Sequence, residues 1–454
     1  MAKRQSLEKY KEKNRTLHRR WDMIRVRVFT VLIAVFFVLG LLLFLRPKQS
    51  ATEKRDLATF PAFSLSGIWD GSWFSDVETW YADSYPMREK LIMAGTNIEN
   101  LYGIRSSAIY VASPSTQTDD QSQQTDSSTS ASGSATASAA STTEETDAGG
   151  AITIQPESAG TIYVADGRGF ELYYSNHDSL DAYASMVNTV ADNLGDNADV
   201  YVMGIPNSFG IMLDESIQTS MGCPLQSDET DYIYDQIDDK VKKVEIYDTL
   251  RAHNDEYLYF RTDHHWTQRG AYYAYTKFCE AKGITAHSLD DYESKSYEGF
   301  LGTFYAASNQ SPELGNNPDT VETFIPIATN DEVITDSDGK TYDRNIVGDA
   351  DSLGTESKYL CFIGGDQPLV EIDNPDIDDG SACILIKESY GNAFAPFLVD
   401  HYDKLYIVDY RYSSADLTAL AKEQTSCDVI FANVMILLDD TARAQKMQTL
   451  FPAE

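Results

Sequence analysis

From Thr161 onward the sequence repeats one pattern, a short continuous apolar run followed by a turn and then a helical segment. The runs that carry the pattern are residues 199–203, 382–386, 404–408 and 428–432. Strands that are apolar on both faces are typical of a parallel sheet covered by helices on both sides. We therefore predict an α/β fold built on a parallel sheet flanked by helices. Residues 291–380 are richer in Gly, Asp, Asn and Pro, and we expect loops and short antiparallel strands there.

One further strand and helix are indicated near the middle of the chain. Residues 256–260 are aromatic and alternate in polarity, which predicts a strand. Residues 268–281 carry apolar side chains at helical spacing, with Thr267 as the N-cap and Gly283 as the C-terminal stop. The short connection between the two elements therefore falls at the sheet edge where α/β proteins build their sites.

That connection carries Asp263, His264 and His265. In an extended segment Asp263 and His265 point to the same side and His264 to the other. A carboxylate beside an imidazole fixes its tautomer and stabilises its charged form, which prepares a general base. Two other interpretations stay open: a purely structural pair, and a metal site with His253 as a further ligand. No second cluster of Asp, Glu, His or Cys supports the metal site, so we expect no metal.

A general base needs a nucleophile, and Ser389 is the outstanding candidate. It follows the run that ends at Lys387, precedes the small Gly391, and opens a segment that we predict to be helical. A helix N-terminus offers N–H groups that can hold an oxyanion. The alternative is that Ser389 is only an N-cap.

Other polar and aromatic residues lie at the same predicted edge. Lys387 and Glu388 are interpreted as solvated flanks of the strand. The candidates for holding an oxyanion or substrate are Tyr390, Asn392, Asn207, Ser208 and Trp266. For the two asparagines and Ser208, simple turn polarity is the competing interpretation.

Composition excludes several classes of function. The net charge of −34 is far too acidic for a nucleic-acid binder. The five cysteines are an odd number and form no C-x-x-C pair, which excludes a full disulfide framework and leaves a zinc ribbon unsupported. One bridge stays open, and we expect no cofactor.

The amino end predicts a membrane anchor. Residues 1–27 hold ten Lys or Arg against three Asp or Glu, a net charge of +7, and residues 28–45 are an uncharged apolar run. A helix of that length spans about 27 Å, close to the hydrocarbon core of a bilayer. Because basic flanks stay cytoplasmic, we expect everything after Leu45 to lie outside the cell. A cleaved signal peptide is the competing interpretation, but no small-residue cleavage site follows Leu45.

The remaining chain divides by composition. Residues 53–112 mix charged and aromatic side chains and form the N-terminal part of the external domain. Residues 113–150 are rich in Ser and Thr and nearly free of large apolar side chains, which predicts a disordered insertion. Similar predicted strands flank it at 108–112 and 161–165, so we place it within one domain. A linker between two domains and a glycosylated stalk are the alternative interpretations. Residues 151–454 form the main domain.

Several long motifs, in order, resemble those of the bacterial DHHW proteins. They are RTDHHWT at 261–267, GAYYAY at 270–275, GFLGT at 299–303, FIGGDQPLV at 362–370 and KESYGNAFAPF at 387–397. The resemblance covers about residues 53–112 and 160–450. It implies an SGNH-hydrolase-like fold similar to the periplasmic alginate O-acetyltransferases, which carry a D-x-H-W motif before a nucleophilic serine.

By that resemblance Asp263, His265 and Ser389 take the three roles of a catalytic triad, whose geometry does not depend on chain order. The sequence departs from the family pattern at Asp366-Gln367, where an Asn-His pair is expected, and at Glu388, where Asp is usual. The first departure puts a substrate-binding role of that loop in doubt.

The sequence thus predicts a membrane-anchored, extracellular O-acetyltransferase that acts on cell-surface polysaccharide through an acyl-enzyme. A membrane-bound O-acyltransferase is the expected acetyl donor. An esterase with the same triad and a non-catalytic glycan-binding protein are the alternatives. A metal-dependent phosphoesterase of the DHH type lacks the additional aspartate motifs that its chemistry needs.

Overall fold

The computed structural model describes residues 161–453 and, before them, Arg27, Thr30 and residues 49–50, 55–56, 59–63, 73–74, 77, 80–81, 84–85 and 108–111. Most of the predicted membrane anchor at 28–45 and all of the predicted insertion at 113–150 lie outside these residues. Among the residues described, no helix combines the length and apolarity needed to cross a bilayer.

The chain divides into two compact units, residues 1–95 and 96–454. In the first, β1 (Gln49–Ser50) pairs with β2 (Arg55–Asp56), and Trp80 packs edge-on against Phe60 with ring centroids 4.8 Å apart. Everything below concerns the second unit.

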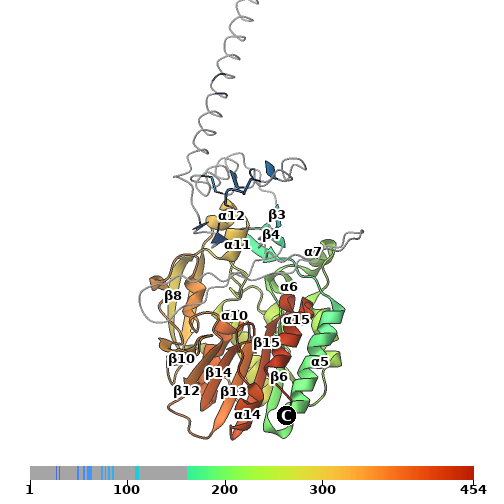
Figure 1. Cartoon of the computed structure of the whole chain (residues 1–454), viewed down its shortest axis with the longest axis vertical. Coiled ribbons are helices and arrows are strands. Elements are labelled where there is room, and N and C mark those ends of the chain that lie inside the picture. Colours follow the sequence, from blue (N-terminus) through green and yellow to red (C-terminus); the bar gives the residue numbers. More distant parts are fainter. Residues whose placement is uncertain are drawn as a thin grey trace, which may run out of the picture. The chain divides into compact units, whose positions relative to one another are not determined.

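The second unit contains a large sheet with helices packed beside it (Figure 1). Its strands are β3 (Ala108–Val111), β4 (Thr161–Ala165), β5 (Arg168–Glu171), β6 (Asp199–Ile205), β7 (Lys242–Lys243), β8 (Glu293–Phe300), β9 (Asp319–Ile325), β10 (Asp331–Thr335), β11 (Thr341–Asn345), β12 (Leu369–Asp373), β13 (Ser381–Lys387), β14 (Lys404–Asp409) and β15 (Ser426–Val434). Its α-helices are α5 (His177–Leu194), α6 (Ser208–Met212), α7 (Glu215–Ser220), α8 (Gln226–Gln236), α9 (Tyr247–Ala252), α10 (Gln268–Lys282), α11 (Thr303–Ala307), α12 (Pro312–Gly315), α13 (Gly391–Phe394), α14 (Leu417–Lys422) and α15 (Thr441–Thr449). Short 3-10 helices include η5 (Lys358–Cys361) and η6 (Ala395–His401).

The central sheet has eight strands in the order β11-β10-β12-β14-β13-β15-β6-β7. Strands β14, β13, β15, β6 and β7 are parallel, as the continuous apolar runs predict. Strands β12, β10 and β11 extend this parallel part by antiparallel pairing, so the whole sheet is mixed. Those three strands, and the separate β8–β9 pair, come from residues 291–380, where short antiparallel strands were expected.

Two apolar cores lie against the two faces of the sheet. Alternate residues of each parallel strand contribute to one core or the other: Ile384 faces α5, α14 and α15, whereas Leu385 faces α10. Figure 1 shows α5 and α15 packed together beside β6 and β15. The double-sided burial explains why these strands read as unbroken apolar runs.

Both strands that were expected to flank the insertion are present. Strands β3 and β4 pair antiparallel, with Ala108 opposite Val164. The two flanks of residues 113–150 therefore meet in one small sheet, which β5 completes.

Candidate active site

The Asp-His-His segment is a tight loop that leads into α10. The strand that we expected at 256–260 is absent: only Tyr259 bridges to Trp266, and residues 261–265 form consecutive bends. The Phe260 N–H closes the loop by donating to the His265 carbonyl at 3.2 Å. Helix α10 begins as expected, because the Thr267 hydroxyl caps the Gly270 N–H and Gly283 ends the helix with φ of 79°.

Asp319, fully buried at the start of β9, holds the first half of this loop. Its Oδ1 accepts from the Arg261 N–H at 2.9 Å and from the Tyr257 hydroxyl. Its Oδ2 accepts from the Thr262 N–H at 2.7 Å and the Thr262 hydroxyl at 2.6 Å. A carboxylate with this many donors fixes the backbone immediately before Asp263.

Asp263 and His265 form a buried pair. The Asp263 Oδ1 accepts from the His265 Nδ1 at 2.5 Å and from the His265 N–H at 3.0 Å. Its Oδ2 accepts from the N–H and the hydroxyl of Thr303, at 2.9 and 3.1 Å. Burial acts to raise the pKa of Asp263, but the two neighbouring imidazoles and these hydrogen bonds hold that pKa well below its usual range. The ionised carboxylate therefore holds His265 with Nδ1 protonated, so that Nε2 carries the basic lone pair of the neutral ring.

The backbone of Thr303 reaches Asp263 only because the preceding residue is a glycine. A Cβ on Gly302 would lie 2.2 Å from the Asp263 Oδ2. This close approach explains the residues of the GFLGT motif at 299–303: Gly302 makes room for the carboxylate and Thr303 binds it.

His264 does not point away from His265, as alternation along a strand predicts. The two rings lie face to face with centroids 3.8 Å apart and a tilt of 36°. The His264 Nδ1 lies 4.0 Å from the Asp263 Oδ1 and 2.7 Å from the Thr303 hydroxyl. The expectation failed because consecutive bends, unlike a strand, do not place neighbouring side chains on opposite sides.

Ser389 lies two residues beyond β13 and is 5% exposed. The Tyr359 hydroxyl donates to the Ser389 carbonyl at 2.9 Å, while its ring stacks on His265 with centroids 3.8 Å apart. The Tyr390 hydroxyl donates to the His264 carbonyl, and its ring centroid is 5.3 Å from that of His265. Burial raises the pKa of both tyrosines, so both stay protonated donors. The structure thus brings the backbone of residues 389–390 against the histidine loop.

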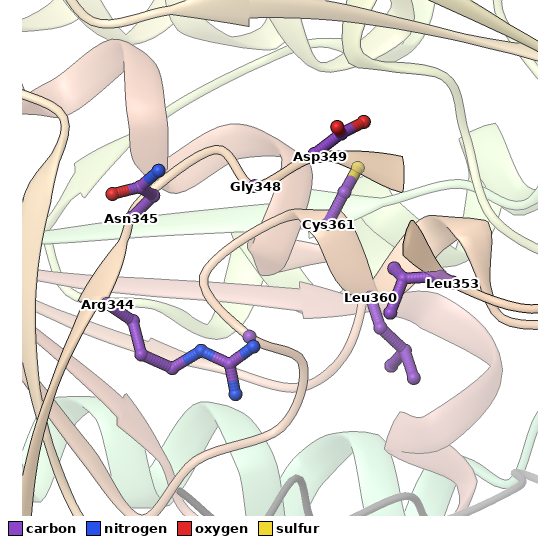
Figure 2. A pocket seen from close by; sticks show the side chains of 8 residues that line it. Arg344, Asn345, Gly348, Asp349, Leu353, Leu360 and Cys361 are labelled. Atoms are coloured by element: carbon purple, nitrogen blue, oxygen red, sulfur yellow. The ribbon is translucent and has the colours of Figure 1, made fainter. Parts of the chain in front are cut away.

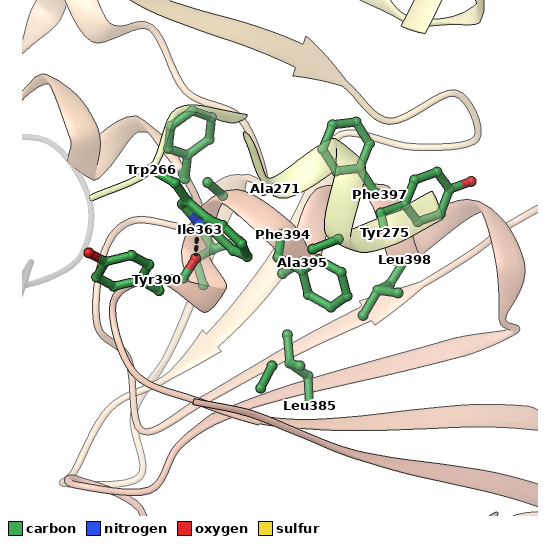
Figure 3. Packing of buried hydrophobic residues seen from close by; sticks show 14 of the residues in the cluster. Trp266, Ala271, Tyr275, Ile363, Leu385, Tyr390, Phe394, Ala395, Phe397 and Leu398 are labelled. Carbon is green, nitrogen blue, oxygen red and sulfur yellow. Dashed lines mark hydrogen bonds between the residues drawn. The ribbon is translucent and has the colours of Figure 1, made fainter. Parts of the chain in front are cut away.

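Trp266 contacts the same backbone from within the apolar core. Its Nε1 donates to the Tyr390 carbonyl at 2.8 Å, the dashed line in Figure 3, and its ring is fully buried. Phe394 and Leu385 are in the same apolar cluster (Figure 3). The helix expected to open at Ser389 begins instead at Gly391 and has four residues, so Ser389 is not its N-cap.

The chain around Ser389 is held by a buried ionic cluster. Lys387, interpreted from sequence as a solvated flank, is fully buried. Its Nζ lies 2.7 Å from the Asn392 Oδ1, 3.3 Å from the Asp409 Oδ2 and 3.4 Å from the Asp366 Oδ1. Arg411 pairs with the same two aspartates at 2.8 and 2.7 Å. Asp366, one of the two residues that depart from the family pattern, therefore neutralises the buried cations Lys387 and Arg411.

Glu388 and Asn207 make buried hydrogen bonds to neighbouring segments. Glu388 is also fully buried rather than solvated, and it accepts from the Asn433 side chain at 2.9 Å and the Val434 N–H at 2.8 Å. Asn207 caps α6 and accepts from the Gln226 side chain at 2.7 Å. The Ser208 hydroxyl is buried and has no hydrogen-bond partner among the described residues. All five cysteines are buried free thiols.

A metal ion fits this loop poorly. The potential ligand atoms of Asp263, His264 and His265 lie within 4.8 Å of one another. Both Asp263 oxygens, however, already accept from N–H and O–H donors that a cation would have to displace. His253, the fourth proposed ligand, stands apart with its Nδ1 3.0 Å from Glu256. The donor set suits a hydrogen-bonded pair better than a metal centre.

A small cavity of about 40 Å³ lies beside η5, the segment that carries Tyr359 (Figure 2). It is lined by Arg344, Asn345, Gly348, Asp349, Leu353, Leu360, Cys361 and Gly364. Its volume suits a few water molecules and is too small for a sugar ring.

Sequence reasoning missed Thr303, Asp319 and Tyr359. The GFLGT motif was an available signal for Thr303. Asp319 begins β9 and Tyr359 lies in η5, both far along the chain from the loop that they contact, and no local pattern marks them.

Comparison with known proteins places these residues in a family. The family described as DHHW protein matches residues 53–119 and 111–408. A search of the curated proteins gives no match. The crystal structure of a DHHW family protein from Eubacterium siraeum is 28% identical and covers 65% of this chain and 97% of its own, with a TM-score of 0.58.

Two structures with lower sequence identity also match. Bacillus cereus PatB1 is 16% identical and covers 62% of this chain and 98% of its own, with a TM-score of 0.52. The O-acetyltransferase domain of Pseudomonas putida AlgJ is 13% identical and covers 63% of this chain and 98% of its own. Its TM-score is 0.32.

Proposed function

The chain belongs to the DHHW family, and from that premise we propose that it is an O-acetyltransferase for a cell-envelope polysaccharide, with Ser389 as nucleophile, His265 as base and Asp263 as its partner. The observation that carries the proposal is the buried Asp263–His265 pair, with a 2.5 Å hydrogen bond, in a loop that Tyr359 connects to Ser389. This arrangement prepares an imidazole beside the backbone of a serine at a strand end, as acyl transfer requires.

In the proposed first half-reaction, the His265 Nε2 takes the proton of the Ser389 hydroxyl as the Oγ attacks the acetyl carbonyl of a donor ester. The tetrahedral intermediate collapses, the bond to the donor alcohol breaks, and that leaving group receives the proton from His265. In the second half, a sugar hydroxyl gives its proton to His265 and attacks the acetyl-serine, and Ser389 leaves with that proton. Asp263 stabilises the imidazolium in both halves.

The setting of the reaction is part of the proposal. The basic residues 1–27 and the apolar run 28–45 favour a single membrane anchor with the main domain outside the cell. A tethered enzyme next to the membrane suits a membrane-bound O-acyltransferase as the source of acetyl groups and surface polysaccharide as the acceptor.

The test is a transfer assay with the full-length protein, an activated acetyl ester and a panel of envelope oligosaccharides. We expect O-acetylated sugar, detectable by mass spectrometry, and none from Ser389→Ala. If the protein releases only free acetate with every oligosaccharide of the panel, it is an esterase and not a transferase. Absence of any turnover, with Ser389 never acetylated, would favour a glycan-binding protein.

The reactivity of the serine has a separate test. A structure of PatB1 contains a sulfonyl adduct, and sulfonyl fluorides react with activated hydroxyl nucleophiles. If the proposal is right, such a reagent modifies Ser389 in this chain and His265→Ala slows the modification.

A further inference from the structure

Tyr359 contacts both halves of the candidate site. Its ring lies on the His265 ring, with centroids 3.8 Å apart and an interplanar angle of 12°. Its hydroxyl donates to the Ser389 carbonyl at 2.9 Å. Phe260 and Phe362 pack edge-on against the buried tyrosine ring, with centroids 6.1 and 5.3 Å away. The core therefore fixes the ring from sides that the site does not use.

The Tyr359 hydroxyl stands where a helical hydrogen bond would otherwise form. Burial raises the pKa of this hydroxyl, and a hydrogen bond from the Ala393 N–H acts in the opposite direction. In an α-helix that N–H would donate to the carbonyl four residues earlier, which is the carbonyl of Ser389. The Ser389 carbonyl instead accepts from the tyrosine and, at 3.2 Å, from the Asn392 N–H. Tyr359 thus holds Ser389 in the turn before α13 and outside the helix.

The face of the Tyr359 ring acts on the charge of His265. In the proposed reaction His265 becomes an imidazolium when it takes the proton of the serine, and the negative face of an aromatic ring attracts a cation above it. The other titratable neighbours of the His265 ring include Asp263 and His264 from its own loop and Tyr390 from the serine turn. Asp263 binds the imidazole at its Nδ1 edge, whereas Tyr359 covers a face.

We propose that Tyr359 is a positioning residue of the acyl transfer: its ring face stabilises the imidazolium of His265, and its hydroxyl fixes the turn that carries Ser389. This assignment rests on the proposed function. Because one buried side chain makes both contacts, it also keeps the base and the nucleophile in a constant relation through both half-reactions.

Two variants separate the two contacts. Tyr359→Phe keeps the ring and removes the hydroxyl. A phenylalanine fluorinated on its ring, placed at the same position, keeps the shape of Phe but weakens the negative face. The measurement is the rate at which an activated acetyl ester acetylates the full-length protein, followed against pH. In the proposed mechanism this rate rises as the His265 imidazolium loses its proton and levels off once the ring is neutral.

We expect Tyr359→Phe to lower the level rate about tenfold, the worth of one hydrogen bond, and to leave the midpoint of the pH profile in place. An unchanged rate overturns the role of the hydroxyl.

Relative to Tyr359→Phe, the fluorinated ring should move the midpoint lower by about 0.5–1 in pH and slow the reaction further. The reason is that a less stabilised imidazolium loses its proton at lower pH and its neutral form is a weaker base. Phe278→Leu removes a ring that packs on Tyr201 and Phe394 in the same core, and this control should not move the midpoint. An equal midpoint with and without fluorine overturns the role of the ring.

Failure of the proposed function gives a different result. If wild-type Ser389 is never acetylated, the proposed function falls and the positioning role falls with it. If wild-type Ser389 is acetylated and the Tyr359 variants react like the wild type, only the positioning role is lost. The ring contact also has a test without activity, an NMR titration of His265 in the two Tyr359 variants, assigned with His265→Ala. The same lower midpoint is expected with the fluorinated ring, and equal midpoints contradict the ring contact.

Discussion

The two halves of the candidate site are held in different ways. The histidine loop rests on one buried carboxylate, Asp319, which accepts from neutral N–H and O–H groups of Tyr257, Arg261 and Thr262 and also pairs with the partly exposed Arg261 guanidinium at 3.1 Å. The Ser389 turn is anchored by Lys387, whose ammonium lies in a buried cluster with two aspartates and Arg411. Hydrogen bonds to backbone fix the course of a loop, whereas a buried ion pair is costly to break because the remaining partner stays charged.

This difference predicts that the serine side is the more sensitive to loss of one group. Lys387→Met leaves Asp366 and Asp409 buried with Arg411 as their remaining cation. We expect a loss of about 3–5 kcal/mol in the free energy of unfolding, measured by urea denaturation. The matched control is Lys404→Met. The Lys404 Nζ pairs with Asp373 at 2.8 Å, but both side chains are exposed, so the loss should be less than about 1 kcal/mol. Equal losses in the two variants would contradict the ionic anchor.

Asp319→Asn tests the histidine side with a smaller expected effect. The amide turns a donor toward the N–H groups that the carboxylate now binds, so one or more buried donors lose their acceptor. We expect a loss of about 1–3 kcal/mol in unfolding free energy and slower turnover of an acetyl ester. The control is Glu322→Gln, which alters a half-exposed pair with Arg269. A stability cost as large as that of Lys387→Met would remove the contrast between the two halves.

The pH dependence of stability tests the surroundings of Lys387 through a nearby buried carboxyl, that of Glu332. It is buried on β10 without a hydrogen-bond partner among the described residues, and burial raises its pKa to about 8 although Arg344 and Lys387 act to lower it. The folded protein therefore keeps this proton to higher pH than the unfolded chain. The stability linked to it is complete below about pH 4.5 and is lost as pH rises through about 8.

Glu332→Gln should remove that dependence. We expect the variant to be more stable than the wild type by at least about 1 kcal/mol at pH 8.5, and the difference to shrink toward pH 5. Denaturation midpoints at several pH values measure it. A parallel pH dependence in both proteins would mean that Glu332 is already ionised at neutral pH.

The contrast also shows what the sequence can predict. The parallel strands were predictable because burial on both faces leaves unbroken apolar runs, as in residues 382–386. The Thr267 cap and the Gly283 stop of α10 depend on local backbone chemistry and were predictable for that reason. The pairing of Asp263 with His265 was also expected, although the expectation assumed an extended strand and the residues lie in a loop of bends.

What failed depends on contacts between distant segments. Lys387 was expected in solvent because lysine is rarely buried, and only Asp366, Asp409 and Arg411 make its burial tolerable. His264 was misplaced because the loop follows the hydrogen bonds of Asp319 and Thr303 rather than the alternation of a strand. Asp319 lies far along the chain from this loop and has no local signal in the sequence, whereas Thr303 stands in the GFLGT motif.

The central claim is that Ser389 is acylated with the help of His265. The most direct measurement is the rate at which an activated acetyl ester acetylates the full-length protein, followed by intact mass and peptide mapping. We predict one acetyl group on the peptide that contains Ser389, and a rate at least about 100-fold lower in His265→Ala. Acetylation at another residue, or an unchanged rate at Ser389 in His265→Ala, would contradict the account.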